Sequence, residues 1–187
     1  MNTSGRPILV VYASKHGATK GIADRIAATL IGAGHRVDLR AAHDRIDVSD
    51  YDAFVIGSAI PVDCWLRDAS DFVARNIDHL TRRPVWLFSS GPLGTDTTDA
   101  AGRDLRARSV PQEVTDLAQV IHPRDHHVFF GALDPAGLSP SEKAVRRLPA
   151  ARGLMPEGDF RNWAEIDAWA RGSADEARQP DPTRPAG

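Results

Sequence analysis

The chain has a single cysteine among its 187 residues. One cysteine excludes an internal disulfide and any metal cluster held by cysteines. The sequence also lacks an apolar run long enough to cross a bilayer. Residues 1–7 are polar and do not contain the apolar segment of a secretion signal. We therefore expect a cytoplasmic protein without an integral membrane segment, and these absences leave peripheral contact with a membrane open.

The chain also has no marked excess of positive or negative charge. Lysine and arginine total 23, aspartate and glutamate total 25, and the formal net charge is −2. This near balance gives no electrostatic basis for binding nucleic acid. The apolar fraction of 42% and the charged fraction of 26% are ordinary for a globular protein. The length fits one domain with a substantial core.

The most informative stretch begins with a buried strand and continues into an amphipathic helix. Residues 8–12 form a continuous apolar run rich in β-branched types, which is typical of a strand covered on both faces. Ile22, Ile26 and Leu30 recur at helical spacing and predict a helix that packs on the sheet. The loop between them ends at a helix N-terminus, where free backbone N–H groups and the helix dipole favour an anion.

The residues of this loop suit one terminal phosphate. Ser14 and Thr19 can donate hydroxyl hydrogen bonds to phosphate oxygens. Gly17 allows close approach of the backbone, and Lys15 and His16 can add positive charge. The sequence lacks the Gly-rich motifs of magnesium-nucleotide and dinucleotide sites. The alternative is a turn in which Ser14 and Thr19 only cap the helix.

Residues 10–19, followed by Ala23 and Ile26, resemble the flavodoxin signature, which binds the phosphate of FMN. Residues 51–60 resemble the third strand and the following flavin loop of that family, and residues 89–94 resemble the loop after its fourth strand. Alternating strands and helices independently favour a parallel sheet with helices on both faces. The resemblance implies a flavodoxin-like three-layer α/β sandwich, with a five-stranded parallel sheet in the order 2-1-3-4-5.

The resemblance also implies FMN as the cofactor, held by three loops at the carboxyl edge of the sheet. The first loop would hold the phosphate, the second would flank the ring and ribityl chain, and the third would bind the ring edge. The implied cofactor-binding residues are Ser14, Lys15, His16, Gly17, Ala18, Thr19, Ala59, Ile60, Pro61, Val62, Trp65, Ser89, Ser90, Gly91, Pro92, Leu93 and Gly94.

Aromatic residues near these loops are few. Trp65 offers a face on which a flavin ring could stack, or it packs into the core beneath its own helix. The third loop has no aromatic residue, and Leu93 is its largest apolar group. An open ring face would favour a substrate that stacks on the ring over simple one-electron exchange. No tyrosine, lysine or cysteine is identifiable as a proton donor, so the catalytic residues stay unassigned.

No metal site is expected, because the adjacent His126 and His127 in a strand point to opposite faces. Residues 134–159 follow the last strand and contain several prolines. They include an expected short basic helix at residues 141–148. This segment covers the flavin, recognises an acidic substrate, or is a solvated surface helix.

The domain boundary is expected near the end of a closing helix. Asn162 to Arg171 should form this helix, with a domain at residues 1–171. Residues 172–187 are polar and rich in proline, which predicts a disordered tail.

Two late segments, residues 129–133 and 162–166, are similar to the menaquinone-dependent protoporphyrinogen oxidases. This similarity implies an oxidoreductase that passes electrons from a small organic substrate to an acceptor such as a quinone. An electron carrier that serves a redox partner protein is the alternative, although carriers commonly use a more acidic surface to steer their partners. A third hypothesis is a flavodoxin-like binding or regulatory domain that holds deazaflavin or no flavin. The oligomeric state is not indicated.

Overall fold

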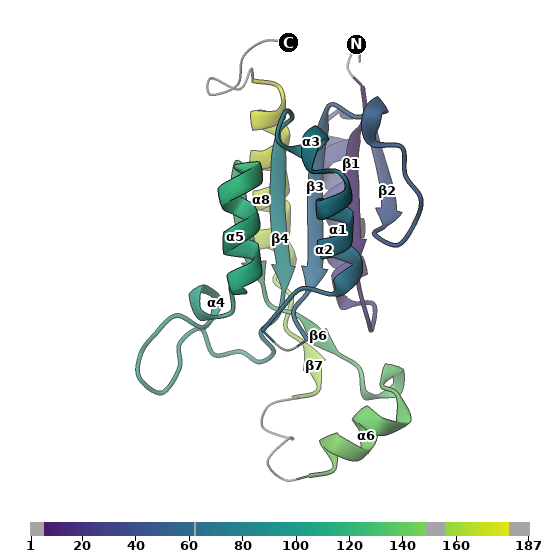
Figure 1. The fold of residues 1–187 in the computed structure, drawn as a ribbon. Coiled ribbons are helices and arrows are strands. Elements are labelled where there is room, and N and C mark those ends of the chain that lie inside the picture. Colours follow the sequence, from purple (N-terminus) through teal and green to yellow (C-terminus); the bar gives the residue numbers. More distant parts are fainter. Residues whose placement is uncertain (1–5, 62, 149–155, 180–187) are drawn as a thin grey trace.

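A parallel sheet of five strands forms the centre of the molecule, in the order β2-β1-β3-β4-β5 (Figure 1). The computed structural model describes residues 6–61, 63–148 and 156–179. The observed sheet confirms the predicted α/β fold and strand order. The strands are β1 (Ile8–Ala13), β2 (Val37–Ala41), β3 (Ala53–Ala59), β4 (Val85–Ser90) and β5 (Asp125–Phe129).

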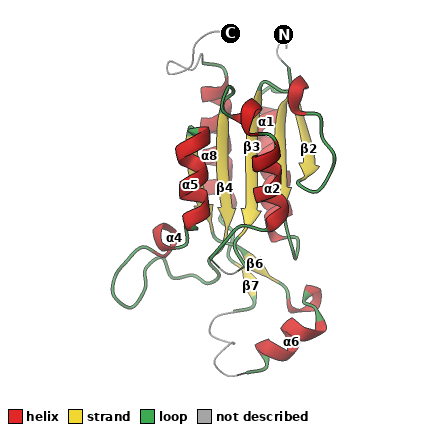
Figure 2. Cartoon of the chain, viewed as in Figure 1, coloured by secondary structure: helices red, strands yellow, loops and turns green. Residues whose placement is uncertain are grey.

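Helices cover both faces of this sheet, with α1 and α8 on one side and α2, α3 and α5 on the other (Figure 2). Alternate residues of β1 enter the two apolar layers: Leu9 and Val11 face the α2 side, whereas Ile8 and Val10 face α1. This explains why the strand sequence is apolar at every position. The helices are α1 (Ala18–Gly32), α2 (Arg67–Arg75), α3 (Ile77–Leu80), α5 (Gln112–Ile121) and α8 (Trp163–Ala177).

The closing helix extends further than its composition suggests. It continues to Ala177 instead of ending at Arg171, and Ser173 and Ala174 are buried. The prediction of disorder is therefore wrong for residues 172–177, because these small residues pack against the rest of the domain. Residues 180–187 of the expected tail lie outside the described residues.

An ion pair joins α8 to α1 across the same face. Arg25 donates two hydrogen bonds of 2.6 Å to the carboxylate of Asp167, and Thr29 Oγ1 donates a third at 3.0 Å. Arg25 chiefly lowers the pKa of Asp167 from its usual value to about 2. The two helices are thus held by polar contacts as well as by apolar packing.

After β5 the chain makes an excursion beyond the carboxyl edge of the sheet (Figure 1). We call residues 134–157 the excursion; β6 (Ala132–Leu133) and β7 (Gly158–Asp159) pair antiparallel at its base. It contains a short 3-10 turn, η2 (Pro135–Gly137), and the helix α6 (Pro140–Arg146). Two further short elements in the chain are η1 (Val48–Asp50) and α4 (Leu105–Arg108).

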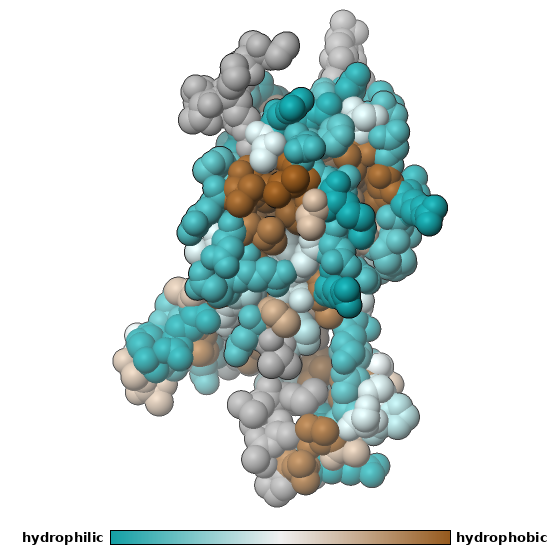
Figure 3. Space-filling view, viewed as in Figure 1, coloured by the Kyte–Doolittle hydropathy of each residue, from teal (hydrophilic) through white to brown (hydrophobic). Residues whose placement is uncertain are grey.

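The helix α6 begins with a capping box. Ser139 Oγ accepts a hydrogen bond from the backbone N–H of Glu142, and the Glu142 side chain accepts one from the backbone N–H of Ser139. The outer surface near α6 includes hydrophobic atoms (Figure 3), in keeping with the 51% and 58% exposure of Val145 and Leu148. The described part of the excursion therefore contains a defined helix with exposed apolar side chains.

Candidate functional site

A cavity of about 530 Å³ lies at the carboxyl edge of the sheet, where β1, β3 and β4 end. All three loops expected from the sequence contribute to its wall, because parallel strands bring their carboxyl ends to one edge. The expected residues that line it are Ser14, Lys15, His16, Ala18, Thr19, Ala59, Ile60, Pro61, Ser90, Gly91, Pro92 and Leu93.

The first loop presents the N-terminus of α1 to this cavity. Gly17 precedes the helix in the left-handed conformation, with φ of 86°, and donates its N–H to Ser14 Oγ at 3.0 Å. Gly21 N–H is the first to bond within the helix, to Gly17 O at 2.9 Å. The N–H groups of residues 18–20 consequently have no intrahelical acceptor.

Two hydroxyl groups accompany these N–H groups. Ser14 Oγ accepts from Gly17, so its own proton stays available for another acceptor. Thr19 is only 1% exposed and lines the cavity from the first turn of the helix. That turn contains no acidic residue. The loop therefore combines a structural turn with a set of donors suited to an anion.

A carboxylate from the excursion reaches the same loop. Glu142 Oε1 lies 2.5 Å from Lys15 Nζ and 3.1 Å from His16 Nε2. The Lys15 ammonium is the main reason why the pKa of Glu142 lies far below its usual range. Glu142 also lines the cavity, so an internal anion stands beside the predicted phosphate site.

The rest of the cavity is mainly apolar. Ala59, Ile60 and Pro61 come from the loop after β3, and Leu93 from the loop after β4. Such a wall suits a flat aromatic ring.

Sequence reasoning missed several residues of the lining. Residues 131–133 follow β5, so the edge rule that identified the other loops could also have found them. The other residues come from loops and from the short helices α4 and α6, whose positions depend on distant contacts. The lining residues that were missed are Asp63, Leu105, Ser109, Gly131, Ala132, Leu133 and Glu142.

The structure places Trp65 in the core rather than against the cavity, which corrects the expected stacking. Its indole is 3% exposed, and its N–H donates to Ser89 Oγ at 2.9 Å. Ser89 is itself buried, and its Oγ lies 2.9 Å from His126 Nε2. An indole N–H can only donate, so Ser89 Oγ is the acceptor in its bond with Trp65. The buried hydrogen bond between Trp65 and Ser89 therefore connects the second loop to the third.

Two other expected residues also lie outside the lining. Gly17 shapes the first loop through its backbone, and Gly94 turns the third loop with φ of 114°. Neither residue is part of the cavity wall. Val62 falls outside the described residues.

The adjacent histidines point to opposite faces, as the strand pattern predicted. His126 faces Ser89, whereas His127 Nε2 lies 2.8 Å from Glu165 Oε1 on α8. Burial lowers the pKa of His126 from its usual value near 6.5 to about 4. Within the described part of the chain, no group of three or more histidine, cysteine, aspartate or glutamate side chains is arranged to hold a metal ion.

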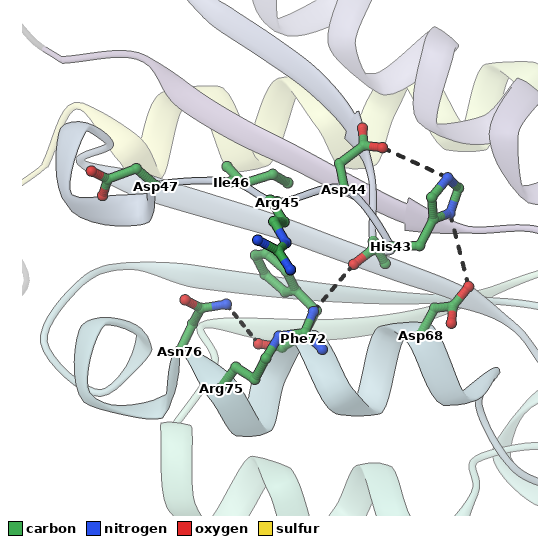
Figure 4. Close-up of a pocket in the computed structure, with 10 residues that line it drawn as sticks. His43, Asp44, Arg45, Ile46, Asp47, Asp68, Phe72, Arg75 and Asn76 are labelled. Carbon is green, nitrogen blue, oxygen red and sulfur yellow. Dashed lines mark hydrogen bonds and ion pairs between the residues drawn. The ribbon is translucent and has the colours of Figure 1, made fainter.

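A second hollow, of about 660 Å³, lies between the end of β2 and α2 (Figure 4). Its charged groups largely face one another: His43 lies 3.6 Å from Asp44 and 3.9 Å from Asp68. Arg75 points to the backbone oxygen of Ala42 at 3.5 Å. Mixed charges give this hollow no preference for an anion or a cation, so the cavity at the sheet edge is the stronger candidate site.

A search of curated proteins finds no match. Among the described helices, none is long and apolar enough to cross a membrane.

Solved structures share the fold at low sequence identity. A flavodoxin from the domain Archaea matches with a TM-score of 0.58 and 13% identity, over 92% of this chain and 99% of that chain. Oxidised flavodoxin 2 from Bacillus cereus matches with a TM-score of 0.52 and 20% identity, over 91% and 99%. Rubredoxin oxygen:oxidoreductase from Desulfovibrio gigas matches with a TM-score of 0.59 and 11% identity, over 94% of this chain but 37% of that larger one.

The family comparison covers most of the sheet, the cavity and the start of the excursion. The family model described as "Flavodoxin domain" matches residues 9–150, which is more than half of the chain. The chain therefore belongs to the flavodoxin-domain family.

Proposed function

We propose that this chain is an FMN-binding redox protein. The observation that carries the proposal is the meeting of three loops around one cavity, with the open N-terminus of α1 at one end. The flavodoxin domain and the flavodoxins of similar fold support FMN as the cofactor.

The donor set fits this group. Ser14, Thr19 and the first N–H groups of α1 would bind the phosphate. Residues 59–61 and Leu93 would flank the ring, while backbone groups of residues 90–92 would meet its polar edge. When bound, FMN supplies the ability to accept and release electrons, and the chain orients the ring and limits its contact with water.

We further propose an oxidoreductase that passes electrons from a small organic substrate to an acceptor such as a quinone, as the similarity to protoporphyrinogen oxidases implies. Two features support this reading. Leu93, not an aromatic residue, lines the cavity from the third loop. A hollow of about 220 Å³ beside α6 is lined in part by Lys143, Arg146 and Arg147, which suits an acidic group.

An electron carrier for a redox partner protein is the second candidate function. The family match and the fold shared with flavodoxins favour it equally. Anaerobic reduction of the protein, followed by reoxidation with quinones or with one-electron protein acceptors, separates the two. Porphyrinogen oxidation coupled to quinone reduction supports the enzyme, and rapid transfer only to proteins supports the carrier.

The FMN assignment predicts that Thr19→Val weakens FMN binding at least tenfold. The substitution keeps the shape of a buried side chain but removes a hydroxyl, and a hydrogen bond to a charged group contributes about 1.5–3 kcal/mol. Titration followed by flavin fluorescence and visible absorption measures the effect, with riboflavin as the ligand without phosphate. Thr81→Val, at the exposed end of α3, is the control and should leave both affinities unchanged.

Two results would contradict this assignment. Folded wild-type protein that retains no FMN after gel filtration would overturn it and direct attention to deazaflavin or to a binding domain without flavin. Equal losses for FMN and riboflavin in Thr19→Val would show that Thr19 does not act on the phosphate.

A further inference from the structure

We propose that Glu142 is a specificity-determining residue of the cofactor site, which weakens binding of phosphate-bearing flavins by pairing with Lys15 and His16. The inference rests on the proposed function and adds a residue that belongs to the excursion rather than to the three loops. It assigns to the excursion a direct influence on the choice between a flavin phosphate and an unphosphorylated flavin.

The carboxylate of Glu142 is held from two sides. Oε1 contacts Lys15 Nζ at 2.5 Å and His16 Nε2 at 3.1 Å, while Oε2 accepts from Ser139 N–H at 2.9 Å and from Ser139 Oγ at 2.7 Å. The side chain of Glu142 is 20% exposed. Both carboxylate oxygens therefore have hydrogen-bond partners, and these partners fix the position of the negative charge.

The carboxylate of Glu142 lies beside the predicted phosphate site. Glu142 lines the same cavity as Ser14 and Thr19, which come from the start of α1. Its pKa is held far below the usual range, mainly by Lys15, so the carboxylate is ionised at neutral pH. A phosphate monoester carries a charge of about −1.5 to −2 at pH 7 and would meet this carboxylate in the cavity.

The carboxylate acts on a bound phosphate in two ways. It repels the phosphate directly, and it engages the ammonium of Lys15, which could otherwise attract the phosphate. Repulsion between like charges at a partly exposed site is expected to change the affinity by about tenfold. A flavin without phosphate has no charge at this position, so its affinity should be insensitive to Glu142.

Glu142→Gln is the sharpest test, because glutamine removes the charge and keeps the capping box of α6. We expect the dissociation constant for FMN to fall about tenfold, while that for riboflavin stays within about twofold. The gain should shrink in 1 M salt, since partly exposed charges are screened. Fluorescence titration with both flavins gives the selectivity, and circular dichroism verifies the fold.

A matched control exists in the same excursion. Glu157 pairs with Arg146 at 3.2 Å and does not line the cavity, so Glu157→Gln makes the same change in net charge away from the loop. It should leave the selectivity unchanged. Lys15→Gln should lower FMN affinity in the wild-type background, because it leaves the carboxylate of Glu142 without its ammonium partner. It should also lower FMN affinity when combined with Glu142→Gln, which frees the lysine.

The outcomes separate this inference from the proposed function. A wild-type chain that binds neither flavin overturns both. Wild-type binding of FMN with unchanged selectivity in Glu142→Gln, or with weaker FMN binding in that variant, overturns the role of Glu142 alone. A change of equal size in Glu157→Gln would assign the effect to overall charge and would also overturn the inference.

Discussion

Replacing Gly57 by alanine is expected to lower the free energy of unfolding by about 3 kcal/mol. Gly57 lies in the buried strand β3, opposite Phe88 of β4. A β-carbon at this position would lie 2.0 Å from Phe88 Cζ, and 2.2 and 2.3 Å from the two Cε atoms. Such distances are far shorter than any van der Waals contact, so the ring or the strands must move.

The ring of Phe88 cannot move easily to make room for the added β-carbon. Its ring is fully buried and packs against Phe129 and Trp169, with centroid separations of 6.2 and 6.3 Å. A shift would therefore disturb the apolar layer beneath α8. Because β3 and β4 carry the second and third loops, we also expect Gly57→Ala to weaken flavin binding.

Gly32→Ala provides the matched control. No heavy atom lies within 4 Å of the β-carbon that this change would add at the end of α1. Alanine should be neutral there or stabilise the helix by up to about 1 kcal/mol. Urea denaturation of both variants measures the difference, and a loss below 1 kcal/mol for Gly57→Ala would show that the packing around Phe88 adapts easily.

The second large effect concerns pH. The free energy of unfolding is expected to fall by about 3 kcal/mol as the pH drops from 7 to 4, through His126. Burial lowers the pKa of His126 from 6.5 to about 4 in the folded protein. In this interval the unfolded chain takes up a proton that the folded chain does not, and each pKa unit corresponds to about 1.4 kcal/mol.

Burial explains why the folded state prefers the neutral ring of His126, because desolvation disfavours the charged form. Ser89 Oγ accepts from the indole N–H of Trp65 and lies 2.9 Å from His126 Nε2, so His126 belongs to a buried group of polar contacts. Protonation of His126 would place a charge in this buried region beneath the second and third loops. The stabilising contribution is thus complete above pH 6.5 and lost as the pH approaches 4.

His126→Gln should flatten the pH dependence between 6.5 and 4, because a glutamine oxygen can accept from Ser89 without titrating. Denaturation curves at a series of pH values measure the slope, and His43→Gln on the exposed surface serves as the control. Asp167, whose pKa is held near 2 by Arg25, loses its contribution only below about pH 4. An unchanged slope in His126→Gln would assign the effect to other groups.

The sheet and its order could be predicted because buried parallel strands leave a strong pattern in the sequence. Residues 8–12 and 85–88 are apolar throughout, as strands covered on both faces must be. The three loops at the edge followed from the same pattern, since each begins where such a strand ends. The closing helix was harder, because the charged Asp175 and Glu176, which follow Ala174 directly, obscured the burial of that residue.

The directions of individual side chains were harder to predict from the sequence than the sheet was. A tryptophan that begins a helix can turn to a cavity or to the core, and local sequence does not distinguish the two; the decisive partner of Trp65 is Ser89, 24 residues away. Glu142 contacts Lys15 although the two are 127 positions apart in the sequence. No periodicity indicates which side chain of the excursion folds back onto the first loop.

The antiparallel pairing of β6 with β7 brings the two ends of the excursion close together. Ala132 lies opposite Asp159 and Leu133 opposite Gly158, so the chain leaves the domain and returns to it at neighbouring points. The entropic cost of closing a loop grows only slowly with its length, so the spacing of these two points allows segments of different length between them. A change in this segment would alter what borders the cavity while the strands of the sheet stay as they are.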